Sequence, residues 1–262
     1  MEDRSVKIKI RNVRKVFGKN SKEVIALDDV NLDVKTDRFT TIVGPSGCGK
    51  STLLYMLAGF EKPTAGEIYL DGRKISAPGP DRGFVFQDYA LFPWKTVLGN
   101  VMFGLINNGR NKKTAQEIAL HFINLVNLNG FENAYPHTLS GGMKQRVAIA
   151  RALADDPEVL LMDEPFGALD AQTRKYMQSE LIKVWEKYHK TVIFVTHSVV
   201  EAAFLSDVVV VMSARPGKPK DIFEAPFPRV RDYTSDHFVS FRKEILDCLE
   251  DEVRKEIEMN HL

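Results

Sequence analysis

The 262-residue sequence predicts an α/β fold in which helices cover a parallel sheet. Two observations carry this prediction. Short apolar runs that are typical of buried strands occur at 39–43 and 159–162. In the last third, strand patterns at 191–196 and 207–212 alternate with helical patterns at 171–188 and 198–205. Such alternation favours parallel pairing, because parallel strands need a crossover connection that is usually a helix.

The remaining segments give the rest of the architecture. Period-two alternation at 6–10 and 30–34 predicts strands with one buried face, and further short strands are expected at 67–70 and 83–86. A helix is expected from 50 to about 58. From 96 to 154 the pattern is helical and broken by glycines, which indicates an inserted helical block. The sequence RPGKP at 215–219 predicts a turn, and the charged stretch 235–259 predicts a surface helix.

Composition narrows the function classes. The 36 Lys and Arg residues nearly balance the 35 Asp and Glu residues, so the chain lacks the basic footprint of most nucleic-acid-binding proteins. Cys48 and Cys248 are too far apart for metal-ligand spacing, and a reducing cytoplasm fits better than a disulfide framework. The first ten residues contain no apolar signal region, and the apolar run at 208–212 is far too short to span a bilayer. We therefore expect any work at a membrane to depend on a partner.

The strongest motif is GPSGCGKS, which runs from Gly44 to Ser51 and matches G-x-x-x-x-G-K-[ST] between a predicted strand and a predicted helix. Small residues allow backbone N–H groups to surround a phosphate, and the helix N-terminus adds further donors. We expect Lys50 to reach the β- and γ-phosphates and Ser51 to ligate Mg²⁺. The alternative is a tight glycine turn. The expected ATP-binding residues of this loop are Gly44, Pro45, Ser46, Gly47, Cys48, Gly49, Lys50, Ser51 and Thr52.

A second motif is the apolar run 159–162 that ends in Asp163 and Glu164. The carboxyl ends of strands in open α/β sheets are where ligands bind, so Asp163 is expected to hold Mg²⁺ and Glu164 to polarise an attacking water. The alternative is an acidic helix cap that follows a core strand.

A third motif is Leu139-Ser140-Gly141-Gly142-Met143, which precedes a helix at 144–154. Ser140 is a good N-cap, and Gly141 and Gly142 would let a phosphate approach the backbone. From physical chemistry alone, a capped helix after a loop is the favoured interpretation.

Taken in order, these motifs resemble those of ATP-binding-cassette (ABC) transporter ATPases. The elements are the loop 44–51, Gln87, LSGGM at 139–143, the strand ending at 159–164, GALD at 167–170, and His197 after a strand. The resemblance covers about residues 5–230. It implies a P-loop NTPase with a RecA-like parallel-sheet core, an N-terminal antiparallel β-subdomain and an inserted α-helical subdomain. Within one domain, 1–262, it assigns 1–92 and 159–231 to the core and β-subdomain, 93–158 to the helical subdomain and 232–262 to a C-terminal helix.

The resemblance also implies roles for single residues. Phe17 would stack on adenine, although a core phenylalanine is the alternative. Gln87 would sense the γ-phosphate and Mg²⁺, and His197 would hydrogen-bond the γ-phosphate. Asp170 would lie at a dimer interface in which each ATP also contacts Ser140, Gly141 and Gly142 of a second copy. Lys50, Gln87, Glu164 and His197 would then be the catalytic residues, with Ser51, Gln87 and Asp163 around Mg²⁺.

The segment 87–105 is rich in apolar and aromatic residues, and Leu91, Phe92, Trp94 and Val97 could form a groove for a permease helix. The alternative is that they pack the helical insertion. The sequence of 78–105 resembles the corresponding part of importers of nitrate, aliphatic sulfonates and taurine. This resemblance implies a peripheral protein on the cytoplasmic face of the membrane that works with a permease and a solute-binding protein. The competing class is a soluble ABC ATPase in DNA repair or translation, and an exporter half is a third. Those soluble proteins carry coiled-coil insertions, paired cassettes or zinc cysteines, and exporters usually fuse a membrane domain, none of which this sequence shows.

Overall fold

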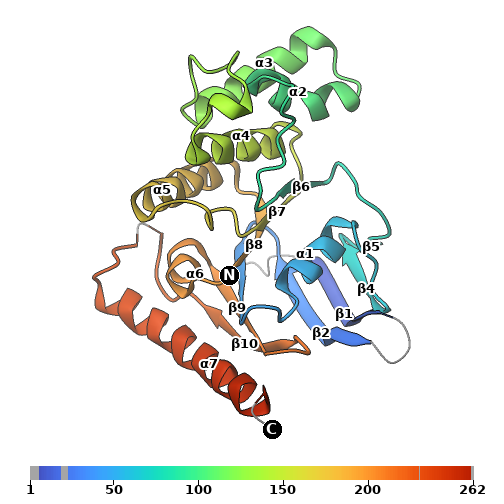
Figure 1. Ribbon diagram of the computed structural model, residues 1–262, viewed down its shortest axis with the longest axis vertical. Helices are drawn as coiled ribbons and strands as arrows, with labels where there is room; N and C mark the ends of the chain where they lie inside the picture. Colours follow the sequence, from blue (N-terminus) through green and yellow to red (C-terminus); the bar gives the residue numbers. More distant parts are fainter. Residues whose placement is uncertain (1–5, 19–22, 230, 261–262) are drawn as a thin grey trace. The chain divides into compact units, whose positions relative to one another are not determined.

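The computed structural model describes residues 6–18, 23–229 and 231–260 (Figure 1). The chain divides into two compact units. The first contains residues 1–79 and 191–262, and the second contains residues 80–190. The ends of the predicted 1–262 domain, at 1–5 and 261–262, lie outside the described residues.

The first unit begins with an antiparallel sheet. It consists of β1 (Val6–Phe17), β2 (Val24–Lys35), β4 (Ala65–Leu70) and β5 (Arg73–Lys74), in the order β2-β1-β4-β5. Ile8 and Ile10 of β1 alternate with more exposed residues and are fully buried on one face. Val13 is also fully buried, and the strand pairing is irregular between Ile10 and Val13. The antiparallel β-subdomain predicted at the N-terminus is therefore confirmed.

The same unit holds the parallel strands. β3 (Phe39–Val43) pairs in parallel with β8 (Thr191–Thr196) on one side and with β9 (Val208–Met212) on the other. β10 (Pro219–Glu224) is antiparallel to β9 and was not predicted, because its charged, half-exposed sequence has no apolar alternation. Helices α1 (Lys50–Ala58) and α6 (Val199–Leu205) follow β3 and β8. All five residues of β3 are buried, as expected for a strand in the middle of such a sheet.

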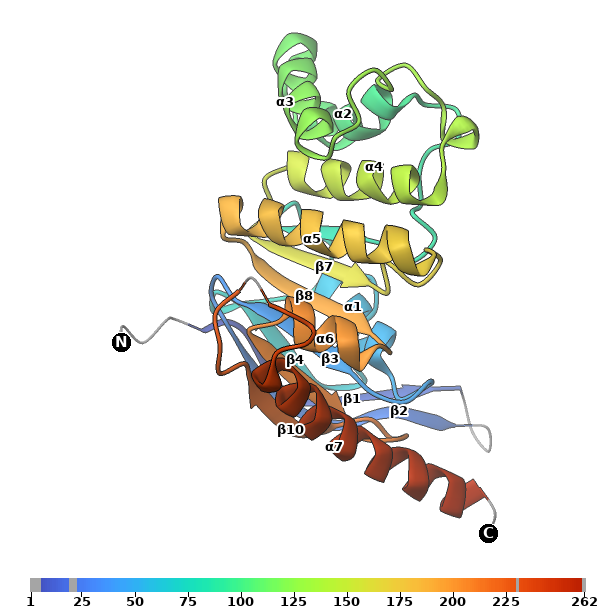
Figure 2. The ribbon, with the colours of Figure 1, turned by 90° about the vertical axis from the view of Figure 1, so that its left-hand side faces the viewer.

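The last helix, α7 (Asp236–Asn260), is part of the core of the first unit (Figure 2). Phe238, Phe241 and Ile245 are buried against α6 and β9, at spacings of three and four that define one helix face. The predicted surface helix is present, but that expectation was incomplete, because this apolar face anchors the helix.

The second unit pairs β6 (Arg82–Val85) in parallel with β7 (Val159–Asp163). Its helices are α2 (Val97–Asn107), α3 (Lys112–Leu125), α4 (Gly141–Ala154) and α5 (Ala171–Tyr188), with a short 3₁₀ turn, η2 (Pro136–Thr138). α2 packs on both α3 and α4, which confirms the inserted helical block. α2 passes so close to the C-terminal end of α4 that a Cβ on Gly104 of α2 would lie 1.8 Å from Asp155 Oδ2.

Among the described residues, no helix has both the length and the apolar character that crossing a bilayer requires.

Candidate functional site

The phosphate-type loop joins β3 to α1 in a conformation that needs glycine. Gly47 has φ 77° and Gly49, the N-cap of α1, has φ 97°, both in the left-handed region. A Cβ on Gly49 would also lie 2.7 Å from Leu27 Cδ2. Loops in which left-handed residues alternate with right-handed ones form concave runs of N–H groups. The first turn of the following helix adds N–H donors without intrahelical partners. The predicted strand–loop–helix context is confirmed.

Lys50 folds back over this loop. Only 6% of the residue is exposed, and its Nζ donates to the carbonyl oxygens of Gly44 at 2.9 Å and Pro45 at 2.8 Å. Within the described residues it makes no ion pair with a carboxylate. Burying an ammonium among neutral acceptors costs free energy because no negative charge offsets its own. Binding of an anion at this position would therefore be favoured.

Cys48 lies inside the same loop and is 1% exposed. Burial raises the pKa of its thiol, although the nearby Lys50 ammonium acts in the opposite direction. A buried, protonated thiol is a packing residue with low reactivity.

His197 is the first residue after β8, and the sheet register brings it close to the loop. Val43, the last residue of β3, is paired with Thr196, so Gly44 and His197 leave neighbouring strands at the same edge. The backbone on both sides of His197 is fixed. Thr196 Oγ1 donates to Glu201 Oε2 at 2.6 Å, and Ser198 caps α6 by accepting from the Glu201 N–H at 3.3 Å.

Phe17 lies at the end of β1 and is 41% exposed, so the alternative of a core phenylalanine is wrong. The ammonium of Lys15 sits 4.9 Å from its ring centroid, and the same ammonium pairs with Glu61 at 2.6 Å. An aromatic ring that is held in place and still exposed can stack on a planar ligand.

In the second unit, the register of β6 and β7 pairs Val85 with Met162. The residues that follow these two parallel strands therefore begin at the same edge of the sheet. A Cβ on Gly167 would lie 3.8 Å from both Gln87 Nε2 and Glu164 Oε2, so these two polar groups flank one point. Asp163 is 3% exposed. Glu164 has φ 42°, a left-handed conformation that costs energy for a non-glycine residue and is concentrated at functional sites.

Ser140 caps α4, because its Oγ accepts from the Met143 N–H at 3.3 Å. The two glycines that follow lie close to side chains of other segments. A Cβ on Gly141 would lie 3.2 Å from the Tyr89 hydroxyl, and one on Gly142 would lie 2.8 Å from Thr173 Cγ2. The capped helix is therefore present, with Ser140 exposed and Gly142 buried at its start.

Asp170 caps α5 by accepting from the N–H groups of Gln172 at 3.1 Å and Thr173 at 3.0 Å. Hydrogen bonds from Thr173 lower the pKa of this carboxyl group. The cap keeps Asp170 ionised and exposed at the end of the GALD segment.

Sequence reasoning missed Arg151 on α4. Its Nη1 donates to the Ala90 carbonyl at 2.6 Å and its Nη2 to the Tyr89 carbonyl at 3.0 Å. Tyr89 and Ala90 have φ values of 60° and 46°, so a cation holds a strained turn directly after Gln87. No local pattern indicates this contact, because 61 residues separate Arg151 from Ala90.

The predicted docking segment 87–105 needs one correction. Val97 is fully buried as the first residue of α2, because it packs the helical block, and so it cannot line a groove. Trp94 is 71% exposed, and its ring lies 5.7 Å from that of Phe92, which lies 4.4 Å from Phe103. These three residues form an aromatic cluster in which Trp94 is exposed and Phe92 and Phe103 are half-buried.

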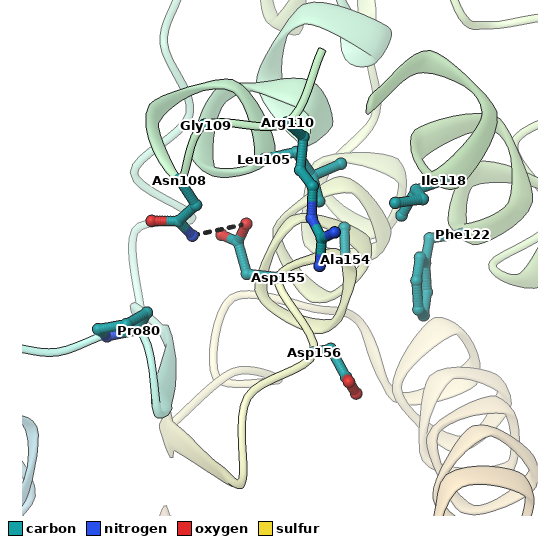
Figure 3. A pocket seen from close by; sticks show the side chains of 10 residues that line it. All are labelled: Pro80, Leu105, Asn108, Gly109, Arg110, Ile118, Phe122, Ala154, Asp155 and Asp156. Carbon is teal, nitrogen blue, oxygen red and sulfur yellow. Dashed lines mark hydrogen bonds between the residues drawn. The ribbon is translucent and has the colours of Figure 1, made fainter. Parts of the chain in front are cut away.

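A pocket of about 630 Å³ opens among α2, α3 and the end of α4 (Figure 3). Asn108 Nδ2 donates to Asp155 Oδ1 at 3.4 Å inside it. Burial raises the pKa of the Asp155 carboxyl group, and Asn108 and Arg151 partly offset this rise. No sequence motif indicated this pocket. Its lining consists of Pro80, Leu105, Asn108, Gly109, Arg110, Ile118, Phe122, Ala154, Asp155 and Asp156.

The comparison with known families decides what these motifs belong to. A model of the family described as "ABC transporter" matches residues 27–167. The chain belongs to the ABC transporter family. This ABC protein is 57% identical over 252 residues to an uncharacterized ABC transporter ATP-binding protein of Methanocaldococcus jannaschii, covering 96% of this chain and 94% of that protein. It is 45% identical over 243 residues to an aliphatic sulfonates import ATP-binding protein of Bacillus cereus, covering 93% and 96%.

A solved structure agrees with the fold. A dimeric ATP-binding cassette in a post-hydrolysis state, bound to ADP and Pi, superposes with a TM-score of 0.73 at 36% identity, covering 83% of this chain and 98% of that one. The α/β P-loop NTPase fold is thereby confirmed, and the chain is an ABC-type ATPase.

Proposed function

We propose that this ABC ATPase powers the uptake of a small anionic solute, such as nitrate, a sulfonate or taurine, through a separate permease. The observation that carries the proposed ATP binding is the buried Lys50 ammonium. It lies in a glycine loop, and its acceptors among the described residues are neutral: the carbonyl oxygens of Gly44 and Pro45 and the Cys48 sulfur. The phosphates of ATP supply the negative charge that this environment lacks. The solute class is supported by the Bacillus cereus relative, whose name refers to sulfonate import.

In the first unit, the loop Gly44 to Thr52 and Lys50 bind the phosphates, and Phe17 stacks on adenine. His197 hydrogen-bonds the γ-phosphate. The register that places Gly44 and His197 at one sheet edge supports this assignment. Because the loop donors are preorganised, they cost little reorganisation when charge develops on the phosphates.

In the second unit, Glu164 is the general base that activates the attacking water, and Gln87 contacts the γ-phosphate. Gln87 and Asp163 are the Mg²⁺ ligands of this unit, and Ser51 is the Mg²⁺ ligand of the first unit. Mg²⁺ usually takes one or two carboxylates plus phosphate oxygens and water, and Asp163 would be its carboxylate ligand here. Bound Mg²⁺ would neutralise charge on the phosphates.

A second copy of this chain completes the site. Ser140, Gly141, Gly142 and Asp170 of one copy contact the nucleotide held by the other, which is supported by the dimeric state of the similar ADP-bound cassette. The free N–H groups at the start of a capped helix are suited to a phosphate.

The membrane partner is a permease that binds the aromatic cluster of Phe92, Trp94 and Phe103. Trp94 is largely exposed, as is typical of an interface residue. The protein would then work peripherally at the cytoplasmic face of the membrane, with a solute-binding protein as an indirect partner.

The test is ATP hydrolysis by the protein reconstituted with its permease, in the presence of solute-binding proteins loaded with a panel of nitrate, sulfonates and taurine. One solute is expected to stimulate hydrolysis, and Glu164→Gln to reduce it by about 10²–10⁴-fold, the usual contribution of a general base. Glu186→Gln, at an exposed carboxylate of α5, is the matched control. Purification with ribosomes or DNA and without a permease would instead favour a soluble ABC ATPase.

A further inference from the structure

The segment 213–218, between β9 and β10, lies against the phosphate loop. Arg215 donates from Nε and Nη2, both at 3.1 Å, to the carbonyl oxygen of Gly47. The backbone of the segment contacts the loop as well, since a Cβ on Gly217 would lie 1.8 Å from the Cys48 carbonyl oxygen. The Gly217 N–H donates a hydrogen bond to the Ala26 carbonyl at 2.9 Å, which fixes this glycine. A cation that is distant in sequence therefore binds the outer side of the loop.

The helix α7 holds this segment through Glu252, which is 5% exposed. Glu252 Oε2 accepts from the Ala214 N–H at 3.1 Å, and Oε1 pairs with Lys220 Nζ at 3.0 Å. Lys220 also donates to the Cys248 carbonyl of α7 at 2.9 Å. A buried carboxylate with both oxygens engaged has one favoured position. The position of α7 thus fixes the residue that precedes Arg215.

We propose that Arg215 is a positioning residue for the phosphate loop, and that Glu252 of α7 fixes its position. This inference rests on the proposed binding of ATP by the loop. Two N–H groups of a guanidinium on one carbonyl polarise the Gly47–Cys48 peptide. This makes the Cys48 N–H, which here donates to the Pro45 carbonyl at a long 3.4 Å, a stronger donor to an anion. They also hold Gly47 in its left-handed conformation, at φ 77°.

The role has a kinetic signature. Arg215 acts on the loop that holds the phosphates in the ground state and in the transition state alike. Its loss is therefore expected to raise the KM for ATP and to leave kcat nearly unchanged. A general destabilisation of the fold would instead lower the melting temperature and change both KM and kcat.

The first experiment measures the Kd of the full chain for ATP by competition with a fluorescent ATP analogue. Arg215→Ala is expected to raise Kd about fivefold, which corresponds to ~1 kcal/mol. Arg215→Lys keeps the charge but loses the planar fork, so we expect a smaller rise. The matched control is Arg254→Ala, at an exposed arginine of α7, with Kd unchanged. If the wild type binds ATP and Arg215→Ala binds it equally well, the inference is wrong. If the wild type does not bind ATP, the proposed function fails instead.

The second experiment tests the route from α7. Glu252→Ala is expected to raise Kd, and the double variant with Arg215→Ala to be no weaker in binding than Arg215→Ala alone, because both changes remove one chain of contacts. If Glu252→Ala does not fold, Glu252→Asp keeps the charge for Lys220 and withdraws the carboxylate from the Ala214 N–H. Glu250→Ala is the control on the same helix. Additive effects, or a normal Kd in folded Glu252 variants, would remove α7 from the proposal.

Discussion

Replacing Arg151 by alanine tests whether α4 supports the turn that follows Gln87. The variant loses two hydrogen bonds from a charged group, to the carbonyls of Ala90 at 2.6 Å and Tyr89 at 3.0 Å. It also loses a contact of the guanidinium with the Phe92 ring, whose centroid is 5.9 Å away. The turn that these bonds hold has two residues in the left-handed region.

The magnitude follows from these contacts. A hydrogen bond from a charged group contributes about 1.5–3 kcal/mol when it is shielded from water. Arg151 is only partly buried, and water can hydrate the freed carbonyls, so the two bonds together are expected to contribute about 2 kcal/mol to the stability of the second unit. Arg151→Lys recovers less than half, because one ammonium cannot reproduce the planar fork.

The chain offers a selective assay. Its two tryptophans, Trp94 and Trp185, both lie in the second unit, so fluorescence during urea unfolding reports on that unit. With a slope of about 1–3 kcal/mol per molar urea, a loss of about 2 kcal/mol lowers the midpoint by about 1 M. Lys113→Ala, at an exposed cation of α3, is the control with an unchanged midpoint. ATP binding at the loop Gly44–Ser51 of the first unit should be unaffected.

A midpoint for Arg151→Ala within about 0.2 M of wild type would show that the turn keeps its conformation without the guanidinium, since so small a shift corresponds to less than ~0.6 kcal/mol. A loss of ATP binding by the isolated chain would contradict the confinement of the effect to the second unit.

Three further predictions concern other positions. Gly49→Ala adds a Cβ that would lie 2.7 Å from Leu27 at a left-handed residue, a conformation that alone costs ~1–2 kcal/mol, so the Kd for ATP measured by fluorescence titration should rise more than about tenfold. Phe17→Ala should raise the same Kd about fivefold, a stacking contribution of ~1 kcal/mol, whereas Phe17→Tyr should not change it; equal effects of both would exclude stacking. The raised pKa of Asp155 means that ionisation of its carboxyl group opposes folding, so its contribution to stability is complete below the ordinary value of 3.8 and falls as the pH rises through the raised pKa. Asp155→Asn should therefore unfold at higher urea than wild type at pH 7 with the difference lost near pH 4, and a difference independent of pH would contradict this.

The sequence predicted the elements that depend on local pattern. The bounds of β3, α1, α5 and β8 agree with the predicted ranges, because buried strands are continuous apolar runs and helices show their period within a few turns. β10 was missed, since an edge strand that pairs only with β9 needs no apolar face. For Val97, the stated alternative of packing the helical insertion is confirmed, and only the structure could decide it, because burial of an apolar residue depends on its neighbours in space.

What the sequence alone determined about this protein is its chemistry class. The phosphate loop, the strand ending in Asp163 and Glu164, and the LSGGM segment each consist of adjacent residues, so their order along the chain is sufficient for the resemblance to ABC ATPases. Only the tertiary structure decided which side chains support them. Arg215 is 168 residues from Gly47, and Arg151 is 61 residues from Ala90. In long-range contacts of this kind, one flexible side chain donates hydrogen bonds to backbone carbonyls. Every residue type carries a carbonyl, so such contacts leave no pattern in the sequence.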